Sequence, residues 1–477
     1  MPRATLNPVA PFPHAARDNS YSVVTSTRQS ALWLLLGFVL LLAGLAAFMA
    51  SPKLGIMALG LPALPLLVLF PPQALMLVIA LVPFDAVASL GPPRSTTITK
   101  LVAVAVIAGW VVHLLIRRQR LRMGGPALLL VAYVAFAAAS SIWAEDRAAT
   151  FHRLQLLVQL LILYIMVVNL ITSPTLLERS LNVLLASSVV VAGLFLWHLP
   201  SETLGPGRAT LALGERAYNP DGLAKTLVFP AIAAVALGRA ASFPRWWRFA
   251  SLVPVGIAVL LTAARGAGLA LLAGLVFLAL MRPRLGIRIS GFILAGVIAL
   301  MLVAPKGYLE RIEQRYAGAA EDRGSGRLDI WAVGMTMIRD RPFQGTGFGG
   351  FQPAFYRYMA ETTLDPRWAA ANSAGRRVPH NTYLNSLAEL GIFGAGIFYA
   401  ALVAHCACVL HAFRSSRHAG NLQGVNLSLA ILGMLVALLV TGLTGDFALA
   451  KISWLVLALC QGAGLLLSPT SVKSWAP

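Results

Sequence analysis

The chain has 477 residues, of which 58% are hydrophobic and 12% charged, with a formal net charge of +20 and a mean hydropathy of +0.76. Soluble domains are about a quarter charged, so this composition excludes an ordinary soluble protein. Apolar runs of about 17–20 residues recur along most of the chain, as transmembrane helices require. Because helices satisfy their own backbone hydrogen bonds in lipid, we predict an all-α, polytopic transmembrane bundle of about 12–14 spans.

Hydropathy divides the chain into four parts: a cytoplasmic tail over 1–30, a transmembrane bundle over 31–304, a long periplasmic loop over 305–381 that carries the catalytic groups, and C-terminal transmembrane helices over 382–477. The tail is too long and too polar for a cleaved signal peptide. The predicted spans are 31–50, 54–70, 73–90, 98–116, 126–143, 153–171, 180–199, 223–238, 249–264, 267–281, 288–304, 382–412, 425–443 and 448–467.

Basic residues set the predicted orientation. If the spans alternate, the segments "RRQRLR" (117–122), "RAASFPRWWR" (239–248), "RPRLGIR" (282–288) and "FRSSRH" (413–418) all fall on one side. The positive-inside rule makes that side cytoplasmic, with both termini inside and the long loop outside. The net charge therefore favours a lipid bilayer, anionic lipid or pyrophosphate as partners, and we expect no nucleic acid.

Two features of the long loop predict local structure. Leu328, Trp331, Met335 and Ile338 recur at helical spacing, so we expect an amphipathic helix over 326–339 that ends before Pro342. The following "GTGFGG" (345–350) matches a dinucleotide-binding pattern, but that reading requires a preceding strand. We therefore predict a flexible turn there.

Two arginines are candidates for binding phosphate. Arg265 lies in "TAARGAG", a very short turn between two spans, and Arg327 opens the predicted amphipathic helix. A guanidinium suits phosphate oxygens because it donates two parallel hydrogen bonds. The alternatives are a snorkelling arginine at 265 and a solvated one at 327.

A histidine stands where the long loop becomes a span, in "VPHNTYLNSLAELG" (378–391). Pro379 disfavours helix in the residue before it, so His380 marks the boundary. Histidine titrates near neutral pH and can act as a general base. The alternative is an interfacial histidine without a role, which we expect for the other seven. Asp446 and Lys451 lie five apart near an outer edge, and we expect them to pair.

The runs "GRLDIWAVGMTMIRDRPFQGTGFGGF" and "PHNTYLNSLAELGIFG" resemble the O-antigen ligase superfamily, which also holds Wzy-type polysaccharide polymerases. "TAARGAG" is similar to the Ser-Arg-Gly turn of that family, with Ala264 in place of the serine. The residues that match the family pattern are Arg265, Arg327, Trp331, Pro342, Gly345, Gly347, Phe351, His380, Asn381, Tyr383, Leu384, Glu389 and Gly391.

The resemblance implies an inverting, metal-independent and cofactor-free glycosyl transfer on the periplasmic face of the bacterial inner membrane. The donor is then a glycan on undecaprenyl pyrophosphate, and the acceptor is a sugar hydroxyl on lipid A–core for a ligase or on a second lipid-linked glycan for a polymerase. Arg265 and Arg327 would stabilise the leaving pyrophosphate. His380 would serve as general base, or would orient the hydroxyl or the phosphate.

Further residues are candidates for binding the pyrophosphate or the acceptor: Arg208, Arg216, Arg377, Asn381 and Tyr383. Glu389 follows His380 by nine residues, or two and a half turns of an unbroken helix, so we expect it to be structural. Three other functions stay open: a Wzy-type polymerase, a protein O-oligosaccharyltransferase and a polysaccharide transporter. The transporter is disfavoured because the candidate groups gather at one outer face and not near the bilayer midplane.

Overall fold

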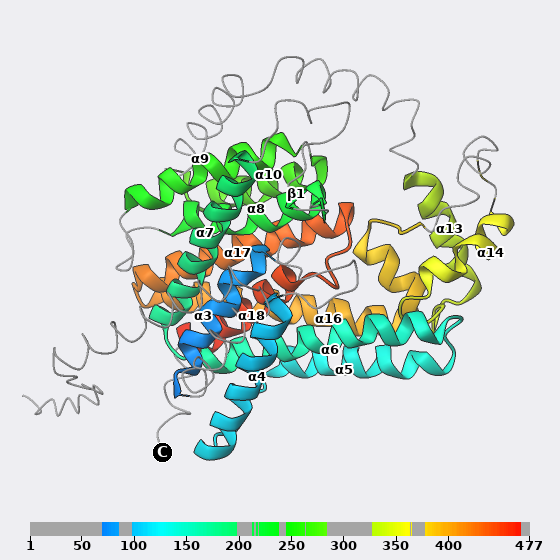
Figure 1. The fold of residues 1–477 in the computed structure, drawn as a ribbon, viewed down its shortest axis with the longest axis horizontal. Coiled ribbons are helices and arrows are strands. Elements are labelled where there is room, and N and C mark those ends of the chain that lie inside the picture. Colours follow the sequence, from blue (N-terminus) through cyan, green and yellow to red (C-terminus); the bar gives the residue numbers. More distant parts are fainter. Residues whose placement is uncertain are drawn as a thin grey trace, which may run out of the picture. The chain divides into compact units, whose positions relative to one another are not determined.

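The structure is a computed structural model in which residues 69–84, 98–197, 212–213, 216–217, 219–237, 245–262, 264–283, 327–362, 364 and 377–468 are described (Figure 1). The predicted tail over 1–30, the predicted spans 31–50 and 288–304 and nearly all of 54–70 lie outside these residues.

The described residues are helical almost throughout, which confirms the predicted all-α polytopic fold. The helices are α3 (Pro71–Leu81), η1 (Val82–Phe84), α4 (Ile98–Arg117), α5 (Gly125–Ala139), η2 (Ser140–Ile142), α6 (Arg147–Leu170), α7 (Pro174–Trp197), α8 (Pro220–Ala236), α9 (Arg245–Leu261), α10 (Arg265–Met281), α13 (Arg327–Asp340), α14 (Phe351–Glu361), α16 (Thr382–His418), α17 (Leu422–Thr444) and α18 (Lys451–Leu467). Two short strands, β1 (Ala212–Leu213) and β2 (Arg216–Ala217), pair antiparallel.

Within the described residues, five helical segments are long and apolar enough to cross a membrane: Gly125–Ile142, Arg147–Leu170, Pro174–Trp197, Thr382–His418 and Leu422–Thr444. α7 begins six residues before the predicted span 180–199, so that boundary was wrong. The cause is a buried ion pair: Glu178 is 2% exposed and binds Arg248, 1% exposed, at 3.1 Å. Pairing allows this carboxylate to enter the bundle, although hydropathy alone excludes it.

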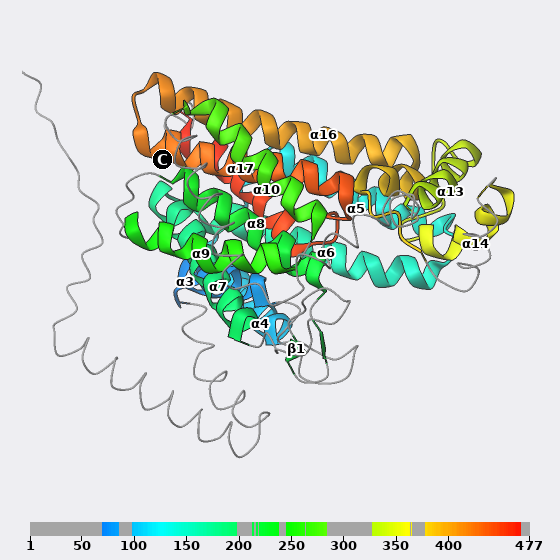
Figure 2. The same cartoon turned by 90° about the horizontal axis from the view of Figure 1, so that it is seen from above.

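α17 lies at the centre of the bundle, where it packs against α8, α10, α16 and α18 (Figures 1 and 2). A buried hydrogen-bond cluster joins three other helices nearby. The hydroxyl of Tyr164 on α6 lies 2.7 Å from His405 Nε2 on α16 and also contacts Gln461 on α18. His405, for which we expected no role, therefore links spans by side-chain hydrogen bonds of the kind that hold membrane helices together.

The amphipathic helix predicted over 326–339 is confirmed as α13, but its predicted apolar face was wrong. Leu328 and Met335 are 55% and 43% exposed, whereas Ile330, Val333 and Met337 are buried. These three belong to a small hydrophobic core shared with α14. The position of the partner helices decides which face of α13 is buried. The spacing of apolar residues within α13 does not show where those partners lie.

The "GTGFGG" segment is a packed turn bound to a break in α16, and the predicted flexibility was wrong. Gly391 has a φ of 61° inside α16, so the predicted helix over 382–412 is interrupted there. Its neighbour Ile392 donates its N–H to Pro342 O at 2.8 Å. The freed carbonyls of Ala388 and Glu389 accept hydrogen bonds from the turn: 3.0 Å from Thr346 N and 2.8 Å from Gly347 N.

The side chain of Glu389 holds the same turn. It is 2% exposed and binds Arg153 of α6 at 3.2 Å. The carboxylate also accepts a hydrogen bond from Phe351 N, the first residue of α14, at 3.4 Å. These contacts join α6, α14 and α16, as the expectation of a structural glutamate requires.

We predict that Gly391→Ala weakens this joint. At a φ of 61° and a ψ of −169° the backbone is in a region that almost only glycine occupies, and a side chain there costs about 1–3 kcal/mol. A Cβ at this position would also overlap the backbone of Phe343. The expected result is a lower melting temperature of the purified protein. Gly396→Ala on the same helix is the matched control, because a Cβ there meets no atom within 4 Å. Equal melting temperatures for the two variants would contradict the proposed role of the break.

Candidate functional site

The candidate site lies at the end of the bundle where α16 begins, which we call the site end. Five segments meet there: the first turns of α8, α10 and α13, the residues 377–381 and the loop 445–447 that follows α17. The contacts below show how each segment places its polar groups.

His380 has an unusual backbone that its neighbours hold in place. Its φ is 46°, and only one other non-glycine residue in the described part of the chain, Arg118, has a positive φ. Such a conformation costs about 1–2 kcal/mol, so surrounding contacts must impose it. On one side Trp331 Nε1 donates to Pro379 O at 2.7 Å. On the other, Asn381 Oδ1 caps α16 by accepting from Tyr383 N at 3.0 Å.

The loop after α17 is fixed to the start of α16. Thr382 is fully buried, and its hydroxyl donates to Gly445 O at 3.0 Å and accepts from Phe447 N at 2.9 Å. The carboxylate of Asp446, which we expected to pair with Lys451, accepts from Asn385 Nδ2 at 3.3 Å and from Ala448 N at 3.0 Å. Asp446 thereby lies beside the first two turns of α16, and its charge acts on His380.

The charges around His380 favour its neutral form. Partial loss of water contact lowers the pKa of His380 from its ordinary 6.5, and the positive charges of Arg327 and Lys225 lower it further. Asp221 and Asp446 act in the opposite direction. The sum leaves the imidazole neutral at pH 7, with a nitrogen lone pair able to accept a proton.

The structure places the two predicted arginines at the site end on different helices. Arg327 is the first residue of α13, half-buried, and its charge acts on His380. Arg265 is the first residue of α10 and is exposed. Its neighbour Gly266 lies against Thr444 at the end of α17, since a Cβ at Gly266 would overlap the threonine hydroxyl. Arg265 thus starts its helix beside the loop that holds Asp446.

The remaining candidates have different surroundings. Arg208 lies outside the described residues, and Arg216 is described only by its backbone in β2. Arg377 is half-buried three residues before His380. Tyr383 directs its hydroxyl into the bundle, where it donates to Leu439 O at 2.8 Å. The hydroxyl of Tyr383 and the Oδ1 of Asn381 both form hydrogen bonds within the protein.

Lys225 and Asp221, both in the first two turns of α8, are candidate site residues that the sequence reasoning missed. Lys225 Nζ packs against the backbone of Gly445, where a Cβ would overlap it. A signal was present, because a lysine inside a predicted span is a functional candidate by default. The first turn of α8 is also marked by Asn219, whose side chain accepts from Asp221 N at 3.0 Å.

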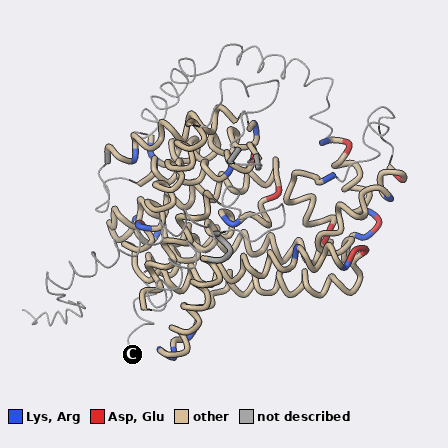
Figure 3. Tube along the Cα trace, in the orientation of Figure 1, with Lys and Arg blue, Asp and Glu red and all other residues tan. Residues whose placement is uncertain are grey.

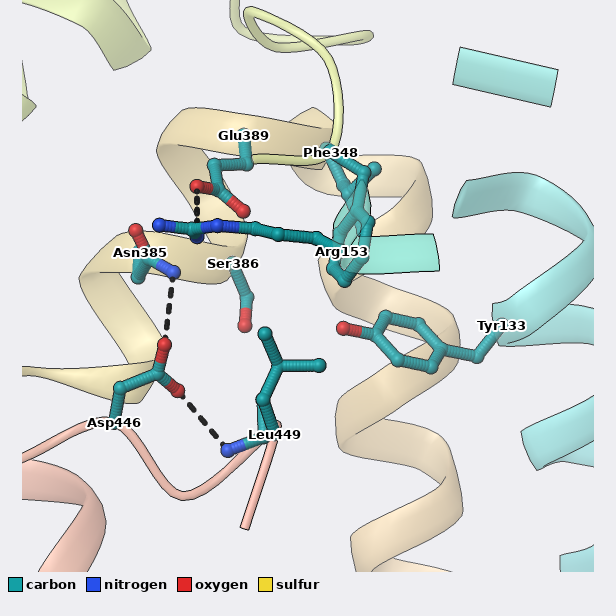
Figure 4. Close-up of a pocket in the computed structure, with 10 residues that line it drawn as sticks. Tyr133, Arg153, Phe348, Asn385, Ser386, Glu389, Asp446 and Leu449 are labelled. Carbon is teal, nitrogen blue, oxygen red and sulfur yellow. Dashed lines mark hydrogen bonds and ion pairs between the residues drawn. The ribbon is translucent and has the colours of Figure 1, made fainter. Parts of the chain in front are cut away.

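A small polar pocket lies one helical turn beyond His380, between α5, α6, α16 and the loop after α17 (Figure 4). Arg153 and Glu389 form its ionic wall, and Asp446 with Asn385 faces them (Figure 4). Asn385 is 7% exposed, and its Oδ1 has no hydrogen-bond partner among the described residues. Asp446 therefore connects the surroundings of His380 to the buried joint at Glu389.

Comparisons with known proteins agree with this picture at the family level. Residues 249–399 match the sequence profile of the family described as O-antigen ligase. No curated protein matches the chain significantly. A solved structure titled "Structural coordination of polymerization and crosslinking by a peptidoglycan synthase complex" is 19% identical, with a TM-score of 0.40, over 74% of this chain and 98% of that one. This last likeness is too weak to bear on function.

The matched stretch covers about a third of the chain and contains most of α9, all of α10, α13 and α14, and the first half of α16. It therefore includes Arg265, Arg327 and His380, together with the glycine turn and the break in α16 to which that turn is bound. This match agrees with the resemblance predicted from the motifs: residues 249–399 are similar to the O-antigen ligase family.

Proposed function

We propose that this protein is a membrane glycosyltransferase that moves a glycan from undecaprenyl pyrophosphate to a sugar hydroxyl of lipid A–core, on the periplasmic face of the bacterial inner membrane. One observation carries the proposal. Within and beside an O-antigen ligase domain, a neutral histidine lies among the positive charges of Arg327 and Lys225. A proton acceptor beside groups that attract phosphate is what such a transfer requires.

The proposed reaction is a single displacement. The acceptor hydroxyl gives its proton to His380 while its oxygen forms a bond to the anomeric carbon of the donor sugar. The bond from that carbon to the pyrophosphate oxygen breaks, and its electron pair leaves with the polyprenyl pyrophosphate. Attack opposite to the leaving group inverts the anomeric configuration. His380 then returns its proton to water or to the released pyrophosphate.

The cations of the site would bind the leaving group. Negative charge develops on the pyrophosphate as its bond to the sugar breaks. Arg327 and Arg265 begin α13 and α10, and Lys225 lies in the second turn of α8, so the backbones that carry the three cations are held by helices before the donor arrives. Fixed charges stabilise a transition state without the reorganisation that water would need. No metal or other cofactor takes part in this scheme.

A Wzy-type polymerase is the second candidate. The superfamily that the motifs resemble holds polymerases as well as ligases. The two differ only in the acceptor, which is a second lipid-linked glycan for the polymerase. An acceptor swap separates them. Consumption of lipid A–core supports the ligase, whereas lengthening of the lipid-linked glycan without lipid A–core supports the polymerase.

We predict that His380→Asn lowers the transfer rate by at least about 10²-fold, the usual contribution of a general base. Asparagine tolerates the left-handed backbone, so this variant removes the base with little effect on the fold. The measurement is glycan transfer by purified protein, with the melting temperature as the control for folding. Transfer at the wild-type rate would show that His380 is not the base.

We predict that Arg265→Ala and Arg327→Ala each weaken binding of a lipid-pyrophosphate donor by about 10–100-fold, the effect of losing a hydrogen bond to a charged group. Arg339→Ala is the matched control, because Arg339 is exposed at the far end of the same helix as Arg327. Titration of the purified protein with labelled donor measures the effect. A variant that binds donor as tightly as Arg339→Ala would have no part in the site.

We predict opposite pH shifts for two substitutions on α8. The charge of Lys225 lowers the pKa of His380, so Lys225→Met raises that pKa and moves the acid limb of the rate profile to higher pH. Asp221 raises the same pKa, so Asp221→Asn moves the limb to lower pH. Transfer rates measured across the acid range test both signs. Two shifts in the same direction, or none, would remove His380 as the titrating group.

A further inference from the structure

A second groove lies at the end of the bundle opposite to the site. α10 starts beside Thr444 and ends at Met281, while α16 runs from Thr382 to His418 before α17 begins. The groove is formed where the end of α10 meets the turn between α16 and α17, and it has a volume of about 640 Å³ including open solvent. Among its lining residues are Met281, Arg282, Phe413, Arg417, Leu422 and Val425.

The groove combines positive charge with exposed apolar walls. Arg282 and Arg417 line it, and no acidic residue is among the described residues that do. Arg282 is held by Asn426, to whose Oδ1 its Nη1 donates at 2.6 Å. This bond holds the guanidinium of Arg282 at the wall of the groove. Met281 and Leu422 are 47% and 75% exposed, so the walls offer apolar surface to an occupant.

The depth of the groove follows from the length of α16 and from the arginines at its end. Phe393 and Phe413 are 20 residues apart along α16, or about 30 Å at 1.5 Å per residue, which is the thickness of the hydrocarbon core. Phe393 is 59% exposed and stacks on Phe343 near the site end. Arginines near helix ends extend to the membrane interface, and Arg414 and Arg417 lie in the last turns of α16. The groove beside Arg417 therefore lies at the depth of lipid headgroups.

The end of the bundle that carries the groove is more basic than the site end. Acidic and basic residues occur together near α13 and α14, whereas the marked residues at the opposite end are mostly basic (Figure 3). Basic pockets between helix ends on the cytoplasmic side bind anionic lipid headgroups. A free inorganic anion would use the arginines but would leave the apolar walls uncovered.

We propose that this groove binds one anionic phospholipid of the adjacent leaflet. The phosphate lies between Arg282 and Arg417, and an acyl chain covers Met281, Leu422 and Val425. The bound lipid joins the end of α10 to the turn between α16 and α17. α10 starts with Arg265 at the site end, and α16 starts just after His380. The lipid therefore stabilises the arrangement of both helices from their far ends.

Native mass spectrometry of the purified full-length protein tests the proposal, with phosphatidylglycerol as the probe and phosphatidylcholine as the neutral comparison. Arg417→Gln is the first variant, because Arg417 is exposed and its loss leaves the fold intact. We expect phosphatidylglycerol to bind about tenfold more weakly, the effect of losing one hydrogen bond to a charged group. Arg282→Gln should have at least the same effect.

Arg414→Gln is the matched control, because Arg414 is exposed on the last turn before Arg417 and does not line the groove. It should bind phosphatidylglycerol like the wild type, and added phosphatidylglycerol should raise its melting temperature by the same amount. Equal binding by Arg417→Gln and Arg414→Gln would overturn the proposal. Equal binding of phosphatidylcholine and phosphatidylglycerol by the wild type would overturn it as well.

Discussion

The break in α16 at Gly391 is the constraint on which the arrangement of the site depends. In an unbroken helix Ile392 N would donate to Ala388 O. Here it donates to Pro342 O, and Ala388 O accepts from Thr346 N instead. One helix thus exchanges its own hydrogen bonds for bonds to the segment between α13 and α14. Because that segment is bound, α13 has a fixed position against α16.

Fixing α13 places Arg327 close to His380. The first turn of α13 supplies Arg327 and the anchor Trp331, which binds the carbonyl immediately before His380. The histidine then occupies a conformation that its own sequence does not favour. A strained residue held by several partners is a common feature of functional sites. The contacts that impose this conformation are made by the adjacent residues Pro379 and Asn381, and the side chain of His380 itself stays exposed.

Local patterns in the sequence predict the elements well and their partners poorly. Hydropathy locates the described spans, and the spacing of apolar residues finds α13 to within one residue. The same spacing selects the wrong face of α13, because Val333 and Met337 are buried by residues of α14 and α16. The glycine turn looks flexible in sequence, since its binding partner at Ala388 is 42 residues away from Thr346.

Some charged groups of the candidate site can be identified from the sequence, and others only from the fold. Motif residues such as His380 and Arg327 can be named from the sequence, because the family resemblance marks them. Lys225 and Asp221 lie more than 100 residues before Arg327 in the chain, and only folding of α8 against the end of α17 brings their charges to His380. Glu178 and Arg248 are similar, since each is costly in a span until the other is placed beside it.

The most direct test of the account is transfer by the purified wild-type protein reconstituted in vesicles. The donor is a glycan on undecaprenyl pyrophosphate, and lipid A–core is the acceptor. The account predicts that glycan appears on the acceptor with inverted anomeric configuration, and that one polyprenyl pyrophosphate is released for each glycan transferred. Retained configuration, or transfer without release of polyprenyl pyrophosphate, would contradict it.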